Sequence, residues 1–330
     1  MDKVPLSKRG RSYLPVGGTS LALPCFFPSI SSVKSNLPSI EYLRVLLAVD
    51  YPQFLVSAYD VYNSPSDEHS SFIDLLSKAT DGNSAVLLDS GNYESYWKQD
   101  AAWDHGRFWS VLEVVPHHLA FCYDNQDPIG GVREITQEIE SAVLRDKDHS
   151  RQGTVLPIVH APTELLPDVV VEVATRLQPI MLAVPERRLG EGILARAESV
   201  ASIRNALDKV ESECALHLLG TGNPISLLIY IIAGANSFDG LEWCQTTVDH
   251  ETGLLYHFQQ RELFKIQPVA ATLPDLPYVS LTLAHNLRFY RTFMIQIQEA
   301  LSGGTLLEFA QNYIPAPFLH ALTTRLAQIS

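Results

Sequence analysis

The stretch "AVLLDSG", residues 85–91, shows the pattern that decides the fold. Four aliphatic residues run without interruption and end at an aspartate, a serine and a glycine. A strand with one exposed face alternates apolar and polar residues, whereas a strand covered on both faces is apolar throughout. The stretch therefore predicts a strand that is buried on both faces and is followed by a tight turn.

Similar runs, rich in β-branched and large aliphatic residues, recur along most of the chain. They lie at residues 19–27, 54–60, 118–124, 155–161, 179–186, 214–222 and 235–243. Between them, residues 129–148, 162–178 and 223–235 carry apolar side chains at three- and four-residue steps, which is typical of helices. Buried strands that alternate with helices predict a parallel sheet with helices on both faces.

About eight such units favour an α/β protein with a (β/α)8 TIM barrel as its single domain. An open, doubly wound sheet is the alternative, but no GxGxxG motif opens a first helix. We expect an N-terminal extension at residues 1–18, the barrel at 19–310 and a C-terminal helical tail at 311–330. No linker rich in proline, glycine or serine divides the chain, and no internal repeat is visible.

The composition is that of a globular protein, because 46% of the 330 residues are hydrophobic. The N-terminus lacks the apolar region of a signal peptide, and the longest apolar stretch, residues 225–235, is too short to span a bilayer. We therefore expect a cytoplasmic protein with no membrane partner. The four cysteines are scattered without CxxC spacing, which favours neither a disulfide framework nor a cysteine zinc site.

The formal net charge of −13 opposes indiscriminate binding to nucleic acid. Phosphate contacts draw mainly on lysine and arginine, so any nucleic-acid contact must be local. Short basic clusters at residues 8–11, 186–188 and 288–291 are the candidates.

Acidic residues and one histidine stand at or just past the carboxyl ends of the expected strands. They are Asp60, Asp89, Asp124, His160, Glu186 and Asp239. An aspartate after a strand also suits the N-cap of the next helix, so one alone indicates little. In a barrel these positions meet at one mouth. Several carboxylates in a partly dry pocket raise at least one pKa, which suits one acid and one nucleophile or base.

Paired carboxylates of this kind support glycosyl chemistry, in which one attacks the anomeric carbon and the other protonates the leaving group. Two alternatives stay open. The loop "GTGN", residues 220–223, suits a phosphate site, which would favour a lyase or hydrolase of a small phosphorylated substrate. His160 is also typical of a histidine that only hydrogen-bonds the scaffold. His105, His117 and His118 have no carboxylate at metal-ligand spacing, so no catalytic metal is expected.

From about residue 20 to residue 310, the strand-end motifs resemble, in order, those of the tRNA-guanine transglycosylase superfamily, the queuine and archaeosine tRNA-ribosyltransferases. That family exchanges a guanine in a nucleic acid for a 7-deazaguanine base, on a TIM barrel and through a covalent intermediate. "LLDSGNY" resembles the segment with the general acid/base and an aromatic that stacks on the base, which implies those roles for Asp89 and Tyr93. "NSFDGLEW" resembles the nucleophile motif, which implies that Asp239 attacks C1′ of the ribose.

Three further motifs imply the base pocket. "LAFCYD" resembles the segment whose aspartate reads the guanine edge, here Asp124. "PIVHAP" places His160 where the family usually has a base-reading glutamine, a departure that bears on base selectivity. "MLAVPE" resembles the strand that lines the pocket with backbone groups and a glutamate, which implies substrate contacts for Leu182, Ala183 and Glu186.

The segment "HLLGTGNP" resembles another part of that pocket and implies contacts from Leu219 and Gly220. Leu219 would then form the second face of a sandwich opposite Tyr93. A purine between the two gains stacking and apolar burial, while Asp124 accepts hydrogen bonds from the N1 and N2 donors of guanine. A displacement in two steps retains the configuration at C1′.

The family's zinc subdomain is degenerate in this sequence. Residues 263–281 contain no cysteine where the family has a C-x-C-x-x-C set, although His285 keeps its H-N-L context. One histidine cannot hold structural zinc, so we expect no metal and no other cofactor. The family's arginine-bearing loop is also replaced, at residues 242–253. We expect a remodelled insertion at residues 245–284.

These departures leave the substrate open among DNA, tRNA and a smaller nucleotide-like molecule. Divergent relatives include DNA 7-deazaguanine transglycosylases and transglycosylase-like proteins of anti-phage operons, as in type IV CBASS. The resemblance implies a glycosyltransferase with a guanine or 7-deazaguanine base, a nucleic acid and a protein from the same operon as its partners. The alternative is a non-catalytic or repurposed 7-deazaguanine-binding subunit of a defence complex.

Overall fold

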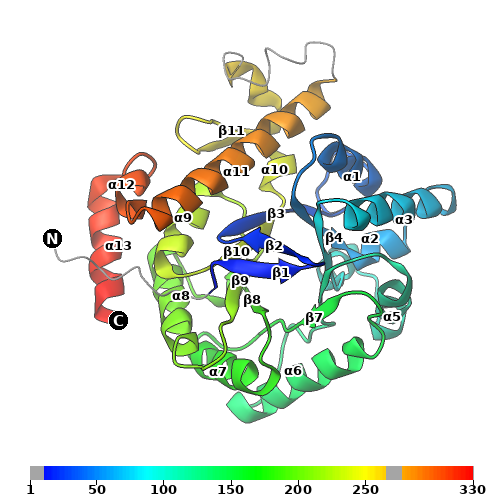
Figure 1. Cartoon of the computed structure of the whole chain (residues 1–330), viewed down its shortest axis with the longest axis horizontal. Helices are drawn as coiled ribbons and strands as arrows, with labels where there is room; N and C mark the ends of the chain where they lie inside the picture. Colours follow the sequence, from blue (N-terminus) through cyan, green and yellow to red (C-terminus); the bar gives the residue numbers. More distant parts are fainter. Residues whose placement is uncertain (1–10, 265–276, 330) are drawn as a thin grey trace.

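The computed structural model describes residues 11–264 and 277–329 of the protein (Figure 1). Residues 1–10 of the expected N-terminal extension lie outside the described residues. So does most of the basic cluster at 8–11, and so do residues 265–276 in the middle of the expected insertion.

Eight parallel strands form a barrel that is surrounded by helices (Figure 1). The strands are β3 (Cys25–Ile30), β4 (Gln53–Ser57), β5 (Ala85–Asp89), β6 (Leu119–Phe121), β7 (Thr154–Leu156), β8 (Met181–Pro185), β9 (Ala215–Leu219) and β10 (Ser237–Gly240). Hydrogen-bonded neighbours run from β7 through β3 and β10 to β8. The last seam closes just after β7, where the N–H groups of Val159 and Ala183 bond to the carbonyls of Ala183 and Pro157. The predicted TIM barrel is confirmed.

The helices follow the strands along the chain, and short elements extend the barrel. The helices that accompany the strands are α1 (Ser39–Ala48), α2 (Ala58–Tyr62), α3 (Ser66–Asp81), α4 (Asn92–Lys98), α5 (His105–Val114), α6 (Val132–Lys147), α7 (Leu166–Leu177), η1 (Glu186–Arg188), α8 (Ile193–Leu207) and α9 (Pro224–Ala233). The remaining elements are β1 (Tyr13–Val16), β2 (Thr19–Ala22), α10 (Glu242–Gln245), β11 (Thr246–Val248), β12 (Leu255–His257), η2 (Phe258–Phe264), α11 (Tyr278–Ser302), α12 (Leu306–Ala310) and α13 (Ala316–Ile329).

Two apolar layers explain why the strands are apolar throughout. In β5, Ala85 and Leu87 belong to the cluster inside the barrel, whereas Val86 and Leu88 belong to the cluster between strands and helices. Successive side chains of a strand point to opposite faces, so both layers draw on every strand. The pattern seen in residues 85–91 is therefore the pattern of a strand with two buried faces.

The first expected strand, residues 19–27, is divided in the structure. Its first half is β2, which pairs with β1 in an antiparallel hairpin, and the barrel strand β3 begins only at Cys25. Pro24 accounts for the break, because proline has no N–H to donate to a strand ladder. Leu14 and Val16 of the hairpin are buried with the barrel interior. The body of the protein therefore begins within the segment expected as an extension.

The C-terminal helices also belong to the body. Helix α13 packs against α8 (Figure 1). Its residues Leu319, Leu322 and Leu326 are buried in the main core. None of the helices in the described ranges is long and apolar enough to cross a membrane.

Asn286, in the H-N-L segment of α11, binds the chain that follows the last barrel strand. Its side chain is fully buried. The Nδ2 group donates to the carbonyls of Trp243, at 2.8 Å, and Thr246, at 2.7 Å. Its Oδ1 accepts from the N–H of Val248 at 3.0 Å. One side chain therefore satisfies three backbone groups of the segment that carries α10 and β11.

We expect Asn286→Ala to lower the free energy of unfolding by about 3 kcal/mol or more, because three backbone groups lose their partner. Urea unfolding followed by circular dichroism measures the change. Gln296→Ala, at an exposed position of the same helix, is the control. A loss no larger than that of the control would show that Asn286 does not hold this segment.

Candidate active site

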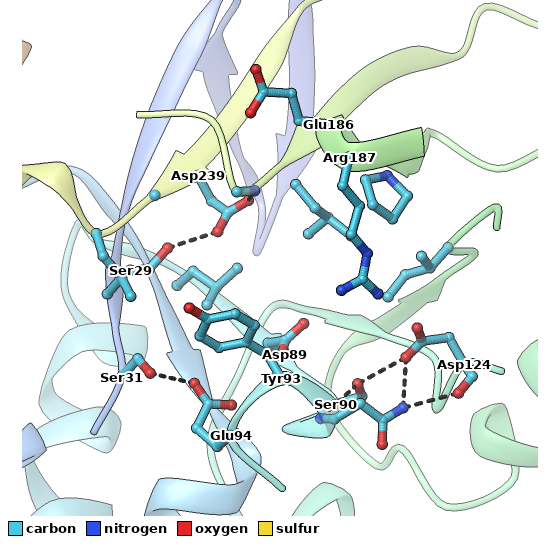
Figure 2. A pocket seen from close by; sticks show the side chains of 18 of the residues that line it. Ser29, Ser31, Asp89, Ser90, Tyr93, Glu94, Asp124, Glu186, Arg187 and Asp239 are labelled. Atoms are coloured by element: carbon cyan, nitrogen blue, oxygen red, sulfur yellow. Dashed lines mark hydrogen bonds between the residues drawn. The ribbon is translucent and has the colours of Figure 1, made fainter. Parts of the chain in front are cut away.

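A cavity of about 460 Å³ opens at the carboxyl ends of the barrel strands (Figure 2). This volume lies in the range of small-molecule sites. Five of the six residues expected at the barrel mouth line it: Asp89, Asp124, His160, Glu186 and Asp239. The barrel therefore brings residues from β5, β10 and three other strand ends to one place.

Asp60 is the exception among the six. It lies in the first turn of α2, because β4 ends at Ser57 and the helix begins at the next residue. Its carboxylate accepts hydrogen bonds from the backbone N–H of Ser32, at 2.5 Å, and from the hydroxyl of Ser39, at 2.9 Å. Asp60 therefore serves the packing of the neighbouring loop and does not line the cavity.

Asp239 is held in place by three donors at the end of β10. The hydroxyl of Ser29 donates to Oδ2 at 2.8 Å, and the N–H of Gly220 donates to Oδ1 at 2.9 Å. Nε2 of His217 lies 3.2 Å from the same Oδ1, and Nδ1 of His217 lies 2.8 Å from the hydroxyl of Ser237. When Nε2 carries the proton and donates to Asp239, Nδ1 accepts from Ser237. The carboxylate is thereby fixed in orientation at the cavity wall.

Sequence reasoning missed Ser29 and His217. His217 is fully buried inside the barrel, between the rings of Phe27 and Phe121. The sequence contains one indication of its role, because His217 is the only polar residue in the apolar run of β9. Ser29 gave no signal of its own, because its role depends on β3 and β10 being neighbours in the sheet.

Asp89 has a different environment at the end of β5. Its Oδ2 accepts one hydrogen bond, from the N–H of Gly91 at 3.1 Å. Burial raises the pKa of Asp89 well above its ordinary value, and the negative charges of Glu94, Asp124 and Asp239 raise it further. A carboxyl group with a raised pKa retains its proton more readily, which suits a general acid. The same residue also holds the turn that starts α4.

Asp124 is paired with His160. Nε2 of His160 lies 2.7 Å from Oδ2, while Ser90 and the side chain of Asn92 donate to Oδ1 at 3.1 and 2.8 Å (Figure 2). Burial would raise the pKa of Asp124, but the hydrogen bond and charge of His160 and the hydrogen bond from Asn92 lower it below its ordinary value. Nδ1 of His160 is buried and has no hydrogen-bond partner among the described residues. That nitrogen belongs to a residue of the cavity wall and can serve a ligand.

The other residues expected to contact a base divide into two groups. Tyr93, Leu219 and Gly220 line the cavity, and so does Glu186. The charge of Glu186 is partly neutralised, because its Oε1 lies 3.0 Å from Nη1 of Arg196. The same oxygen accepts a hydrogen bond from the hydroxyl of Tyr230 at 2.7 Å.

Leu182 and Ala183 do not line the cavity. Both are fully buried in β8, where Leu182 packs toward the helices and Ala183 packs inside the barrel. The backbone N–H and carbonyl of Ala183 are used in the seam that closes the barrel. The structure therefore gives these two residues a place in the scaffold below the cavity.

Two further acids in the cavity wall, Glu94 and Glu242, were missed by sequence reasoning. Burial raises the pKa of Glu242 to about 7. Its carboxylate lies against Gly222 and Gly240, so closely that a Cβ on either glycine would overlap with it. A glycine at the end of β10 and a glycine in the loop after β9 thus make the space for this acid.

Glu94 is almost completely buried beneath Tyr93. One carboxylate oxygen accepts a hydrogen bond from the hydroxyl of Ser31 (Figure 2). The other accepts one from the hydroxyl of Ser57 at 2.7 Å. Burial raises the pKa of Glu94 to about 7, and the negative charge of Asp60 adds to the rise. The wall around Asp89 therefore contains a second carboxyl group that retains its proton more readily than an exposed glutamate.

Part of the loop at residues 220–223 is engaged within the protein. The N–H groups of Gly220 and Thr221 donate to the side chain and the carbonyl of Asp239, at 2.9 and 2.6 Å. Asn223 caps α9 by accepting from the N–H of Ile225 at 3.0 Å. Two of the backbone donors that an anion would need are therefore already used, which argues against an anion site in this loop.

His285, which lies in the H-N-L segment, is also engaged. Its Nε2 lies 2.7 Å from the carbonyl of Val248, and its ring centroid lies 4.1 Å from that of His250. Within residues 11–264 and 277–329, no group of three or more histidine, cysteine, aspartate or glutamate side chains could hold a metal ion.

No family model matches the sequence, and no curated protein matches it. A relationship to the transglycosylase family therefore rests on the motifs and on the site itself.

We expect Gly91→Ala to destabilise the protein by roughly 2 kcal/mol or more. Gly91 has a φ of 82°, and a Cβ at this position would lie 2.6 Å from Cβ of Tyr59. Gly18→Ala is a matched control, because Gly18 has a φ of 81° but no described atom within 4 Å of such a Cβ. Thermal unfolding of both variants separates the close approach from the backbone strain. Equal losses would contradict a tight turn at Asp89.

We expect Glu94→Gln to flatten the dependence of stability on pH. The folded pKa of about 7 lies above the ordinary value of 4.5, so between these values the unfolded chain loses a proton that the folded chain keeps. Stability therefore falls as the pH rises through this window. The neutral amide should remove that loss, on the order of 3 kcal/mol at the upper end.

Urea unfolding across this pH range measures the effect, with Glu308→Gln at an exposed position of α12 as the control. Parallel curves for Glu94→Gln and the wild type would show that Glu94 does not keep a proton in the folded state.

Proposed function

We propose that the protein is a transglycosylase that exchanges a guanine-type base for a 7-deazaguanine base in a nucleic acid. Asp239 is the nucleophile and Asp89 is the general acid/base. The observation that carries the proposal is the pair itself: two carboxyl groups, 150 residues apart in the sequence, line one cavity in unlike environments. One is oriented by three donors, and the other has a raised pKa.

The reaction proceeds in two displacements. The Asp239 carboxylate attacks C1′ of the ribose, the bond from C1′ to the base breaks, and Asp89 gives its proton to the departing base. The incoming base then loses a proton to the Asp89 carboxylate and attacks C1′, which releases Asp239. Each step inverts the configuration at C1′, so the whole reaction retains it.

The remaining wall of the cavity suits a purine. Tyr93 and Leu219 offer one aromatic and one aliphatic side chain for the two faces of the ring. Asp124 offers a carboxylate for the guanine edge, and His160 offers a buried ring nitrogen without a protein partner. Glu186 contributes little free charge, because Arg196 neutralises it. The resemblance adds a setting for this chemistry, a nucleic-acid modification or anti-phage operon with a protein partner.

A 7-deazaguanine-binding subunit without turnover is the second candidate. The contact between Asp124 and His160 favours it, because the carboxylate that would read guanine already accepts hydrogen bonds from His160, Ser90 and Asn92. A base must share that carboxylate or replace one of these donors. The presence of Asp89 and Asp239 in the wall of one cavity favours turnover, since a pure binding site gains nothing from two acids in the same wall.

We expect the wild-type protein, incubated with a guanine-containing oligonucleotide and no incoming base, to form a covalent adduct that survives a denaturing gel. Asp239→Asn should form none, because the amide cannot attack C1′. Asp89→Asn should form it more slowly by about 10²–10⁴-fold, the usual contribution of a general acid. Asp74→Asn, at an exposed position of α3, is the control.

Turnover that is unchanged in Asp239→Asn would overturn the mechanism. Calorimetry with guanine and with 7-deazaguanine bases then decides between the two candidates. Saturable binding together with base exchange supports the enzyme, whereas binding without exchange or adduct selects the binding subunit.

A further inference from the structure

Three aromatic side chains of α4 are exposed beside the mouth of the cavity. The exposed fractions of Tyr93, Tyr96 and Trp97 are 38, 67 and 50%. The ring centroid of Trp97 lies 6.3 Å from that of Tyr93 and 5.8 Å from that of Tyr96, so the rings form one group. We call these three residues the aromatic ledge. A contiguous group of exposed large rings is a common feature of binding surfaces.

Lys34 connects the ledge to the cavity. Its Nζ lies 4.5 Å from the ring centroid of Trp97, and the residue also lines the cavity. Its backbone has a φ of 54°, a left-handed conformation that residues other than glycine seldom adopt. Gln245, another residue of the cavity wall, donates to its carbonyl at 3.3 Å. Such strain gathers at ligand sites. The local structure therefore holds an ammonium group between ledge and cavity.

A second cation reaches the cavity from the opposite wall. Arg187 of η1 lines the cavity and donates to the side chain of Gln126 at 2.9 Å. Figure 2 shows its side chain extending toward the cavity opposite Ser29 and Asp239. In the part of the chain that the structure describes, neither Lys34 nor Arg187 forms an ion pair with a carboxylate. These two cations are therefore available to an anionic ligand.

We propose that Tyr96 and Trp97 of the aromatic ledge, together with Lys34, bind the nucleotide next to the one whose base stacks on Tyr93 in the cavity, so that the ligand is an unpaired, single-stranded segment of nucleic acid. The inference rests on the proposed function, which places one ribose between Asp89 and Asp239. The neighbouring base stacks on the exposed rings, and its phosphate meets Lys34. In a duplex that base is paired and stacked within its own helix, and it cannot lie on a protein ring.

The negative charge of the protein explains why binding of a nucleic acid would require the stacking surface of the ledge. With a net charge of −13, the chain as a whole repels the phosphates of a polynucleotide. Stacking does not depend on net charge and accepts any base. A few rings and two local cations at the cavity mouth can thus hold a single strand where a broad basic surface is missing.

The test is fluorescence anisotropy with a labelled single-stranded oligonucleotide of about ten nucleotides, in DNA and RNA forms, and with the same sequence as a duplex. We expect saturable binding of the single strand, and about tenfold weaker binding by Trp97→Ala. Trp97→Phe, which keeps a ring, should restore most of it. Lys34→Gln should reduce the slope of log Kd against log salt by about 0.7, the value for one phosphate contact in a single strand.

Two controls alter similar residues elsewhere. Tyr13→Ala removes an aromatic that is 61% exposed on the hairpin at the other end of the barrel, and Lys78→Gln removes an exposed lysine of α3. Both should bind as the wild type does. The ratio of affinities for the DNA and RNA forms identifies which polymer the ledge serves.

Failure of the ledge and failure of the proposed function give different results. If Trp97→Ala and Lys34→Gln bind the single strand as the wild type does, or if the duplex binds equally well, the ledge is overturned even when the Asp239 adduct forms. If these variants lose binding and no adduct forms with any of the proteins, the ledge binds single strands but the proposed transglycosylase reaction is wrong. If Trp97→Ala changes the sedimentation of the protein but not its oligonucleotide binding, the aromatic ledge serves self-association, and the proposal that it binds a nucleotide is wrong.

Discussion

The site depends on a constraint of topology: eight parallel strands that close into a barrel must all end at the same rim. Asp89 and Asp239 come from distant parts of the chain and share one cavity because β5 and β10 belong to the same closed sheet. The rim consequently collects negative charge in a partly dry place, where mutual repulsion is strong. The local structure of each loop determines how that charge is accommodated.

The acids at the rim are accommodated in two ways. Asp239 and Asp124 each accept several hydrogen bonds, from donors that include a histidine in both cases. Asp89, Glu94 and Glu242 instead have raised pKa values, because burial disfavours their charged forms. A pocket that contains both kinds of carboxyl group holds an oriented acceptor and a proton donor together. That division is what displacement at a sugar carbon requires.

The proposed single-stranded ligand is a polyanion, whereas the protein is acidic. The cations near the cavity are few, and the aromatic ledge stands beside one of them. Stacking supplies binding energy that does not grow with positive charge, so the ligand need not be held by a large basic surface. The H-N-L segment of α11 has a structural role. Asn286 and His285 hydrogen-bond the backbone of the chain that follows β10, and thereby hold it to α11.

The sequence by itself determined the eight strands, the three helices singled out by periodicity and the position of the acids at strand ends. These features are local. A strand that is buried on both faces is apolar throughout, and the turn that follows it is polar.

Only the tertiary structure decided which polar residues act together. Ser29, His217 and Asp239 lie on three strands, and nothing in any one of those strands announces the contact. Asp60 stands near a strand end as Asp89 does, but an immediate helix turns it toward Ser39. Leu182 and Ala183 match a motif, yet Leu182 is buried against the helices and the backbone of Ala183 is used in the closing seam. Such contacts form only when the barrel closes, because they join residues that are far apart in the sequence. A local sequence pattern therefore cannot show which residues will meet.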